Sequence, residues 1–158
     1  MDCFTLLKQD HDEVAKLIKK CEQEGAKKGA MDTFKKIARN VAVHTRLEET
    51  MFYPRFKNED QLESLLSDAY KEHDQVDRIL AEMAAMTPDD EQWEQKLTEL
   101  KECIEHHVKD EEKEFFPKAQ KVLGKDGAQE LGEAMANEKK EMMKGQHRTK
   151  EVFDRLGL

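Results

Sequence analysis

The chain has 158 residues, of which 39% are charged and only 6% are aromatic, and it contains seven glycines and three prolines. This length suffices for one domain with a core that needs no disulfide bonds, and this composition favours long helices over a sheet or a disordered chain. The formal net charge of −8 argues against a nucleic-acid partner, because proteins that bind phosphate backbones gather positive charge into a patch.

The cysteines and the N-terminal segment indicate the compartment. Cys3, Cys21 and Cys103 are odd in number, widely spaced and without a CxxC pair, so neither a disulfide framework nor a zinc knuckle is expected. The N-terminal segment lacks a basic region followed by a long apolar run. We therefore expect a cytoplasmic protein with no secretion signal and no membrane partner.

Helical periodicity predicts five helices, and the breaks between them contain the glycine, proline, asparagine and aspartate residues that end helices. In chain order the predicted helices span residues 5–24, 31–55, 60–86, 91–123 and 127–156. Connections this short join antiparallel neighbours. The sequence thus predicts an all-α, up-down-up-down four-helix bundle over about 4–123 with an additional C-terminal helix over about 127–156, in a single domain 1–158.

Each of the first four predicted helices places one histidine on its apolar stripe, near the middle of the helix. In chain order these residues are His11, His44, His73 and His107. The second and fourth stripes add Glu48 and Glu111 one turn after their histidines, so each pair shares a helix face. A carboxylate buried without a partner is strongly unfavourable. Four imidazoles and two carboxylates in one core therefore indicate a metal site, whereas a metal-free interaction bundle would require these carboxylates to be exposed.

The two halves of the chain repeat this pattern. The segment HTRLEETMFYP, which starts at His44, matches HVKDEEKEFFP, which starts at His107, and His11 and His73 are each followed by Asp-x-Val. A duplicated helical hairpin would relate the halves by a pseudo-twofold axis. We expect this axis to bring both His-x3-Glu pairs into one central layer, as a symmetric pair of sites.

The donor types restrict the metal. Imidazole and carboxylate without thiolate suit iron, manganese or zinc, and disfavour iron–sulfur, calcium and magnesium sites. Six ligands are too many for one tetrahedral ion. With two bridging carboxylates and a bridging oxide or hydroxide, about two of about twelve octahedral positions stay open. The ligand set thus predicts a dinuclear centre that can bind O2, NO, peroxide or water.

From about His11 to Pro117 the sequence resembles the hemerythrin-like family, also described as HHE cation-binding domains. The motifs that carry the resemblance are His11-Asp12, His44-x3-Glu48-Glu49, His73 and His107-x3-Glu111-Glu112-x2-Phe115-Phe116-Pro117. The resemblance implies two iron ions in a non-haem, oxo- or hydroxo-bridged centre. It also implies that Glu48 and Glu111 bridge the ions and that the four stripe histidines are terminal ligands.

Two departures distinguish the chain from oxygen-carrying hemerythrins. Those proteins have a second histidine four residues after the one on the third helix, where this chain has Asp77, and they end with His-x4-Asp, where it has His-x3-Glu. In these respects the chain is similar to bacterial members linked to iron, nitric oxide or peroxide handling. We expect a protein that binds or reacts with a small oxidant. As an enzyme it would have peroxide- or NO-consuming oxidoreductase activity. The alternative is a module that binds iron, O2 or NO reversibly for storage or sensing.

Two further residues are candidate ligands. Asp77 lies beside its stripe and can act as a ligand, as a partner of one, or as a surface residue. Tyr53 can bind iron, donate to a bound ligand or pack as an aromatic residue; on an ideal helix it points away from His44, although Pro54 can distort this turn.

Other polar residues near the stripes have alternative roles. Glu49 and Glu112 are expected to accept hydrogen bonds from ligands or to be solvated. His106 could replace His107, but both the repeat and the stripe favour His107. His147 is expected to be exposed.

The last predicted helix carries a run of basic residues. These are Lys139, Lys140, Lys144, Arg148 and Lys150. Because glutamates are interspersed among them, we expect a solvated helix face rather than a docking patch.

Overall fold

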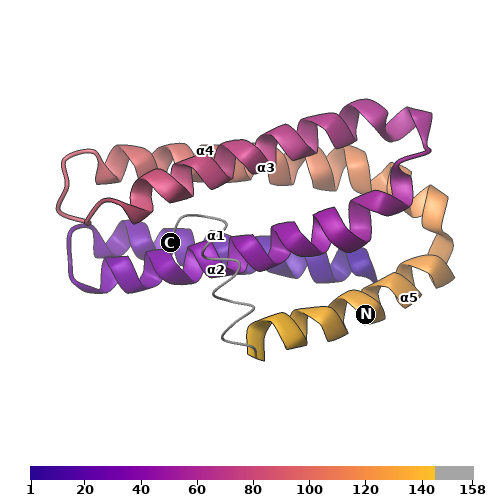
Figure 1. The fold of residues 1–158 in the computed structure, drawn as a ribbon, viewed down its shortest axis with the longest axis horizontal. Helices are drawn as coiled ribbons and strands as arrows, with labels where there is room; N and C mark the ends of the chain where they lie inside the picture. The colour runs from indigo at the N-terminus through magenta and orange to yellow at the C-terminus, as the bar shows by residue number, and fades with distance from the viewer. Residues whose placement is uncertain (145–158) are drawn as a thin grey trace.

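The computed structural model describes residues 1–144, and all regular structure in that range is helical. The five α-helices are α1 (Cys3–Glu24), α2 (Gly29–Leu47), α3 (Glu63–Ala84), α4 (Trp93–Asp110) and α5 (Phe116–Lys144). The first four run side by side as a bundle, and α5 turns back beside α1 and α2 (Figure 1). The predicted all-α four-helix bundle is confirmed. His147 and the basic residues after Lys144 lie outside the described residues.

Short non-α segments follow α2 and α4, and the π-helical ones occupy matching places in the two halves. These are the π-helical segments η1 (Glu48–Phe52) and η4 (Glu111–Phe115) and the 3-10 segments η2 (Tyr53–Phe56) and η3 (Asp60–Leu62). The predicted helix bounds were wrong here. The α-helix predicted over 31–55 ends at Leu47, and the helix predicted over 91–123 ends at Asp110, each followed by a π-helical turn that the α-helical period does not contain.

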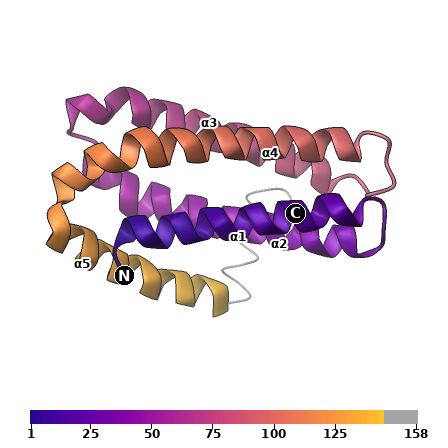
Figure 2. The same cartoon turned by 180° about the vertical axis from the view of Figure 1, so that it is seen from behind.

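The predicted break before the last helix, at residues 124–127, is present as a sharp kink at Gly124. The backbone continues from Phe116 to Lys144, and Gly124 (φ 69°, ψ 175°) is the non-helical residue within it. A positive φ costs a glycine little, so the chain turns sharply there without losing the helices on either side. The kink directs the second part of α5 back along α1, as Figure 2 shows from behind.

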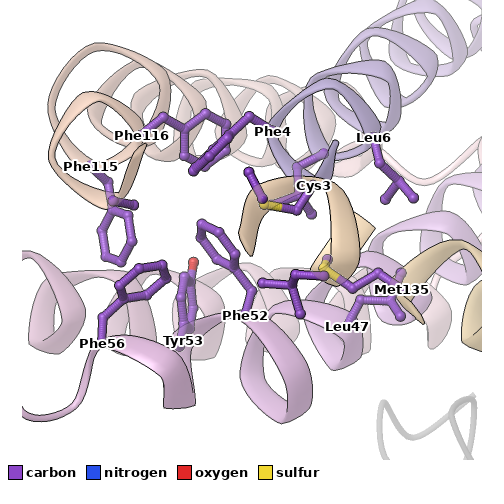
Figure 3. Close-up of a cluster of buried hydrophobic side chains, with 14 of the residues drawn as sticks. Cys3, Phe4, Leu6, Leu47, Phe52, Tyr53, Phe56, Phe115, Phe116 and Met135 are labelled. Carbon is purple, nitrogen blue, oxygen red and sulfur yellow. The ribbon is translucent and has the colours of Figure 1, made fainter. Parts of the chain in front are cut away.

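The core is divided into two apolar clusters by a polar layer. One cluster contains residues from the start of α1, the end of α2 and the segments η1, η2 and η4, including Phe4, Leu47, Phe52, Phe56 and Phe115 (Figure 3). The other, toward the α1–α2 and α3–α4 connections, is built on residues such as Phe34, Leu80, Trp93 and Leu100. All of these residues are at most 6% exposed. On α1, α3 and α4 the stripe histidine lies between residues of the two clusters, and on α2 His44 lies two residues after the last member of the second cluster, Ala42.

Two local features set the start of α1 and the position of α5 against the N-terminal backbone. The Asp2 carboxylate accepts a hydrogen bond from the Thr5 amide at 2.8 Å and caps α1. Gly132 of α5 faces the N-terminal backbone so closely that a Cβ atom there would overlap Met1 and Cys3. No helix within residues 1–144 is long and apolar enough to cross a membrane.

Candidate metal centre

The fold brings the six predicted ligand residues together in the polar layer. They are His11, His44, Glu48, His73, His107 and Glu111, and each is at most 8% exposed. They come from all four bundle helices and from the first residue of each π-helical segment. Because both glutamates precede the change of helical register, each stays one α-helical turn beyond its histidine.

Ligand atoms from these residues form two buried groups that share Glu48. One group contains His11, His44, Glu48 and Glu111, and the other contains Glu48, His73 and His107; within each, the candidate atoms lie within 4.8 Å of one another. Two adjacent His/Glu clusters of this kind are consistent with a binuclear metal site.

The inner Nε2 atoms of the histidines face the two glutamates. His11 Nε2 lies 3.1 Å from Glu111 Oε1, and His44 Nε2 lies 3.2 Å from Glu48 Oε1. On the other side, His73 Nε2 lies 3.1 Å from Glu48 Oε1 and His107 Nε2 lies 3.3 Å from Glu111 Oε2. Each glutamate therefore lies close to histidines from both halves of the chain, and Glu48 also lies 3.7 Å from His107 Nε2.

Four of these inward-facing atoms are buried without a hydrogen bond. They are His11 Nε2, His44 Nε2, Glu48 Oε2 and Glu111 Oε1. His11 Nε2 and Glu111 Oε1 are close, but their orientation does not make a hydrogen bond. Buried polar atoms are rarely left unpaired. A cation between them would satisfy all four, so the residues present fit a metal ion.

The outer Nδ1 atom of each histidine faces a carboxylate. The four pairs are His11–Glu112 at 2.6 Å, His44–Asp10 at 2.9 Å, His73–Glu49 at 2.7 Å and His107–Glu72 at 2.8 Å. A neutral imidazole that donates from Nδ1 keeps its lone pair on Nε2. These carboxylates therefore hold every histidine in the tautomer that binds metal through Nε2.

The carboxylates around the histidines follow the pseudo-twofold repeat. Asp10, which precedes His11, pairs with His44 Nδ1. Glu72, which precedes His73, pairs with His107 Nδ1. Sequence reasoning missed Asp10 and Glu72. Their signal was present, since an acidic residue directly precedes the histidine in both α1 and α3.

Glu49 and Glu112 each pair with a histidine from the other half of the chain. Glu49, next to Glu48, pairs with His73, and Glu112, next to Glu111, pairs with His11. The structure thus places both as acceptors beside proposed ligands, one of the two roles expected from the sequence.

The pKa shifts show that positive charge stabilises the buried carboxylates of the polar layer. Burial alone would lower the pKa of His44, but the carboxylates of Glu48 and Asp10 outweigh it and raise that pKa to about 10. Burial alone would raise the pKa of Glu48, but His44, His107 and His73 hold it well below its ordinary range. Without a metal, imidazolium protons compensate the buried carboxylates. A bound dication would take their place.

Tyr53 lies at the edge of the second group. Its hydroxyl donates a hydrogen bond to Glu111 Oε2 at 2.5 Å and lies 3.4 Å from His73 Nε2. The extra residue per turn of η1 rotates Tyr53 inward, so it faces His73 and Glu111 rather than His44. Its ring stands between those of Phe52 and Phe56 in Figure 3. Burial, Glu111 and Glu48 raise the pKa of Tyr53 well above its ordinary value, which keeps the phenol protonated.

The other candidate residues are placed outside the two groups. Asp77 is half-buried on α3 and contributes to neither. The side chain of His106 is exposed, and its Nε2 lies 3.2 Å from Glu72 and 3.2 Å from Asp110. Lys139 is not simply solvated as expected, because its ammonium group pairs with the buried Asp10 carboxylate.

A small apolar cavity adjoins the layer. It has a volume of about 40 Å³, reaches all four stripe histidines, and is otherwise lined mainly by aliphatic side chains. These are Val14, Val41, Val76, Ile104 and Val108. The space is sufficient for a molecule the size of O2, NO or peroxide.

The fold and this donor set define the class. The chain belongs to the hemerythrin family, because the model described as the hemerythrin HHE cation binding domain matches residues 4–119. The bundle also superposes on the crystal structure of a hemerythrin HHE cation binding domain-containing protein from Mycobacterium kansasii, the Rv2633c homolog. That comparison has a TM-score of 0.80 and 22% sequence identity, and it covers 89% of this chain and 86% of the other.

A second relative is a curated DNA nickase from Nostoc sp. strain PCC 7120. It is 24% identical over 119 residues, which are 73% of this chain and 33% of the nickase. The chain thus spans about a third of the length of that relative.

Proposed function

We propose that this chain is a single-domain, non-haem diiron protein that binds or reacts with a small oxidant, namely O2, NO or peroxide. The observation that carries the proposal is the set of four buried, unpaired ligand atoms on His11, His44, Glu48 and Glu111. These atoms surround a position for one cation beside His11 and His44, and the adjoining group of Glu48, His73 and His107 offers a second. Two iron ions would supply redox chemistry and open coordination positions there.

The proposed ligand roles follow from the two groups. His11 and His44 would bind one ion, His73 and His107 the other, and Glu48 and Glu111 would bridge them. The pairing of every Nδ1 atom with a carboxylate supports these roles, because it orients each ring before metal arrives. Asp77, outside both groups, is given no ligand role.

Iron is proposed over softer metals because neither group of candidate ligands contains a thiolate. Burial raises the pKa of the Cys3 thiol to about 12 and that of Cys21 to about 11, so both stay protonated. They lie in the apolar clusters on either side of the polar layer. Imidazole and carboxylate alone suit iron or manganese with open positions.

The ligand class is proposed from the cavity and its approach. A groove of about 540 Å³ between α1 and α4 reaches His11 and Glu112, and it shares Ile104 and Val108 with the inner cavity. These two side chains form a wall that a diatomic molecule can pass when they move. Tyr53 holds a proton at the far edge of the layer, where it can be donated to a bound oxidant or replaced by iron.

Reversible binding is the second candidate. The aliphatic lining of the cavity favours it, because valine and isoleucine side chains give a neutral O2 or NO molecule an environment with few proton donors. No nucleic-acid nicking is proposed, because the net charge is −8 and the matched relative is three times longer than the matched region.

Metal analysis after anaerobic reconstitution with Fe²⁺ tests the centre. We expect two irons per chain, and loss of iron in His44→Ala and Glu111→Ala. Glu105→Gln is the matched control, since Glu105 is an exposed carboxylate on α4 outside both groups. Unchanged iron content in both site variants would refute the proposal.

Titration of the loaded protein with O2, NO and peroxide separates the two candidates. Disproportionation of two peroxide molecules to one O2 and two waters supports an enzyme, and a stable oxygenated optical and Mössbauer spectrum supports a carrier. A visible phenolate-to-iron(III) band that disappears in Tyr53→Phe would identify Tyr53 as a ligand.

A further inference from the structure

A third group of metal-type donors lies on the outer surface of α3 and α4. It consists of Glu72, His106 and Asp110, with candidate atoms within 4.8 Å of one another. His106 Nε2 lies 3.2 Å from Glu72 Oε2 and 3.2 Å from Asp110 Oδ2. His106 is exposed and the two acids are half-buried, so the group is open to solvent.

Glu72 belongs to both this group and the inner layer. Its Oε1 atom accepts from His107 Nδ1 at 2.8 Å, while Oε2 faces His106. One carboxylate can therefore hold an inner ligand and bind an outer cation at the same time, with a different oxygen for each.

Comparison with the other half of the bundle shows that the outer oxygen of Glu72, Oε2, has no ammonium partner among the described residues. The pseudo-equivalent residue Asp10 pairs with His44 through one oxygen and with the Lys139 ammonium through the other. Lys139 comes from α5, which lies beside α1 and α2 and away from α3 and α4 (Figure 1). Within residues 1–144, the Glu72 oxygens meet no lysine or arginine.

The position of Lys139 in one half is therefore taken in the other by a histidine and a second carboxylate. Two carboxylates and one imidazole leave net negative charge, which a divalent cation would neutralise.

A narrow depression connects this group with the inner layer. It has a volume of about 10 Å³, which leaves room for about one water molecule or ion. Its lining includes Glu72 and Asp110 of the outer group together with His107 and Glu111, proposed ligands of the second ion.

We propose that Glu72, His106 and Asp110 form a third site, which captures a first-row divalent cation from solvent and passes it to the second inner position. The supply role rests on the proposed diiron centre, whereas the outer site itself does not. In capture, Glu72, His106 and Asp110 bind the cation, and in transfer the intact ion moves from Glu72 to His107 and Glu111 without electron transfer. The competing explanation is an ordinary surface ion pair between His106 and Asp110.

Calorimetric titration of the diiron-loaded protein with Zn²⁺ tests the outer site. We expect one Zn²⁺ per chain beyond the two irons, and loss of this equivalent in His106→Ala and in Asp110→Asn. Glu105→Gln makes a matched charge change on α4, in the groove that faces α1, and should keep the equivalent. A third equivalent that survives in both site variants, or one that the unmodified chain does not bind, overturns the proposal.

Stopped-flow absorbance with Co²⁺ and the metal-free protein tests the supply role. His106→Ala should fill the inner positions to the same final content but more slowly than the unmodified chain and Glu105→Gln. Equal rates overturn the supply role. Absence of any inner metal would refute the diiron proposal, while the Zn²⁺ titration of the same protein still reports on the outer site.

Discussion

The two halves of the centre differ in the aromatic residue that stacks on a histidine of the polar layer. Tyr53 stacks on His73 with ring centroids 5.5 Å apart, whereas its counterpart Phe116 stacks on His11 at 6.2 Å. Only the tyrosine adds a hydroxyl, which donates to Glu111 Oε2. The two proposed iron positions are thus chemically different although their histidines are related by the repeat.

Replacement of Tyr53 by phenylalanine should destabilise the metal-free protein. The Tyr53→Phe substitution keeps the aromatic packing but removes one donor from a buried carboxylate, at a cost of about 1–3 kcal/mol. Urea unfolding of the metal-free proteins measures this. Phe116→Tyr is the matched control: it adds a hydroxyl beside His11 and should not restore stability in the double variant. Equal stability of Tyr53→Phe and the unmodified chain would contradict the prediction.

The π-helical turns η1 and η4 are the elements that give the site its shape. Each begins at a bridging candidate, Glu48 or Glu111, and ends at a buried phenylalanine, Phe52 or Phe115. The wider turn shifts the register after the glutamate, so the following aromatic residues enter the core instead of circling to the surface. The Phe52 and Phe115 rings then meet at 5.6 Å and close the layer on this side.

The turns also mark the limit of what the sequence could predict. The apolar period of 3.6 residues predicted the four helices and the six inward-facing residues, because burial and helix geometry alone determine that face. A π-helical turn has no such signature in the apolar period, and the Phe52–Phe115 contact that accompanies it joins residues far apart in the chain. The orientation of Tyr53 toward His73, and of Lys139 toward Asp10, could not be predicted for the same reason.

Helix α5 is tied to the centre through one ion pair. Lys139 contacts Asp10, which accepts from His44 Nδ1. The Lys139→Met substitution keeps the aliphatic stem but leaves a charged Asp10 oxygen without its cation. We expect a loss of about 1–3 kcal/mol in unfolding free energy and weaker iron binding, measured by urea unfolding and by competition with a chelator.

The neighbouring Lys140 supplies the control for this prediction. It is exposed, so Lys140→Met changes the net charge equally without touching Asp10. If both variants lose the same stability, net charge rather than the ion pair is responsible. An Asp10→Asn double-mutant cycle then isolates the pair, because the coupling energy disappears once Asp10 is neutral.

At the scale of the whole molecule, the bundle is two apolar clusters joined by a charged layer, so its stability depends on which cations occupy that layer. In the metal-free protein the cations are imidazolium protons. The pKa of His44 rises from 6.5 to about 10 on folding, so the stability from its protonation is complete below about pH 6.5 and is lost as the pH rises toward 10. The pKa of Glu48 falls below 4.5, so its contribution is complete above about pH 4.5 and is lost in acid.

The metal-free protein should therefore be most stable between about pH 4.5 and 6.5 and should lose stability from pH 6.5 to 9. Iron competes with the same protons, so its affinity and its stabilising effect should increase over that range. Urea unfolding of metal-free and iron-loaded protein at each pH measures both trends, which should diverge. In His44→Ala the alkaline loss of the metal-free form should be smaller, because one raised histidine pKa is gone. A metal-free stability that increases from pH 6.5 to 9 would show that protons do not hold the layer together.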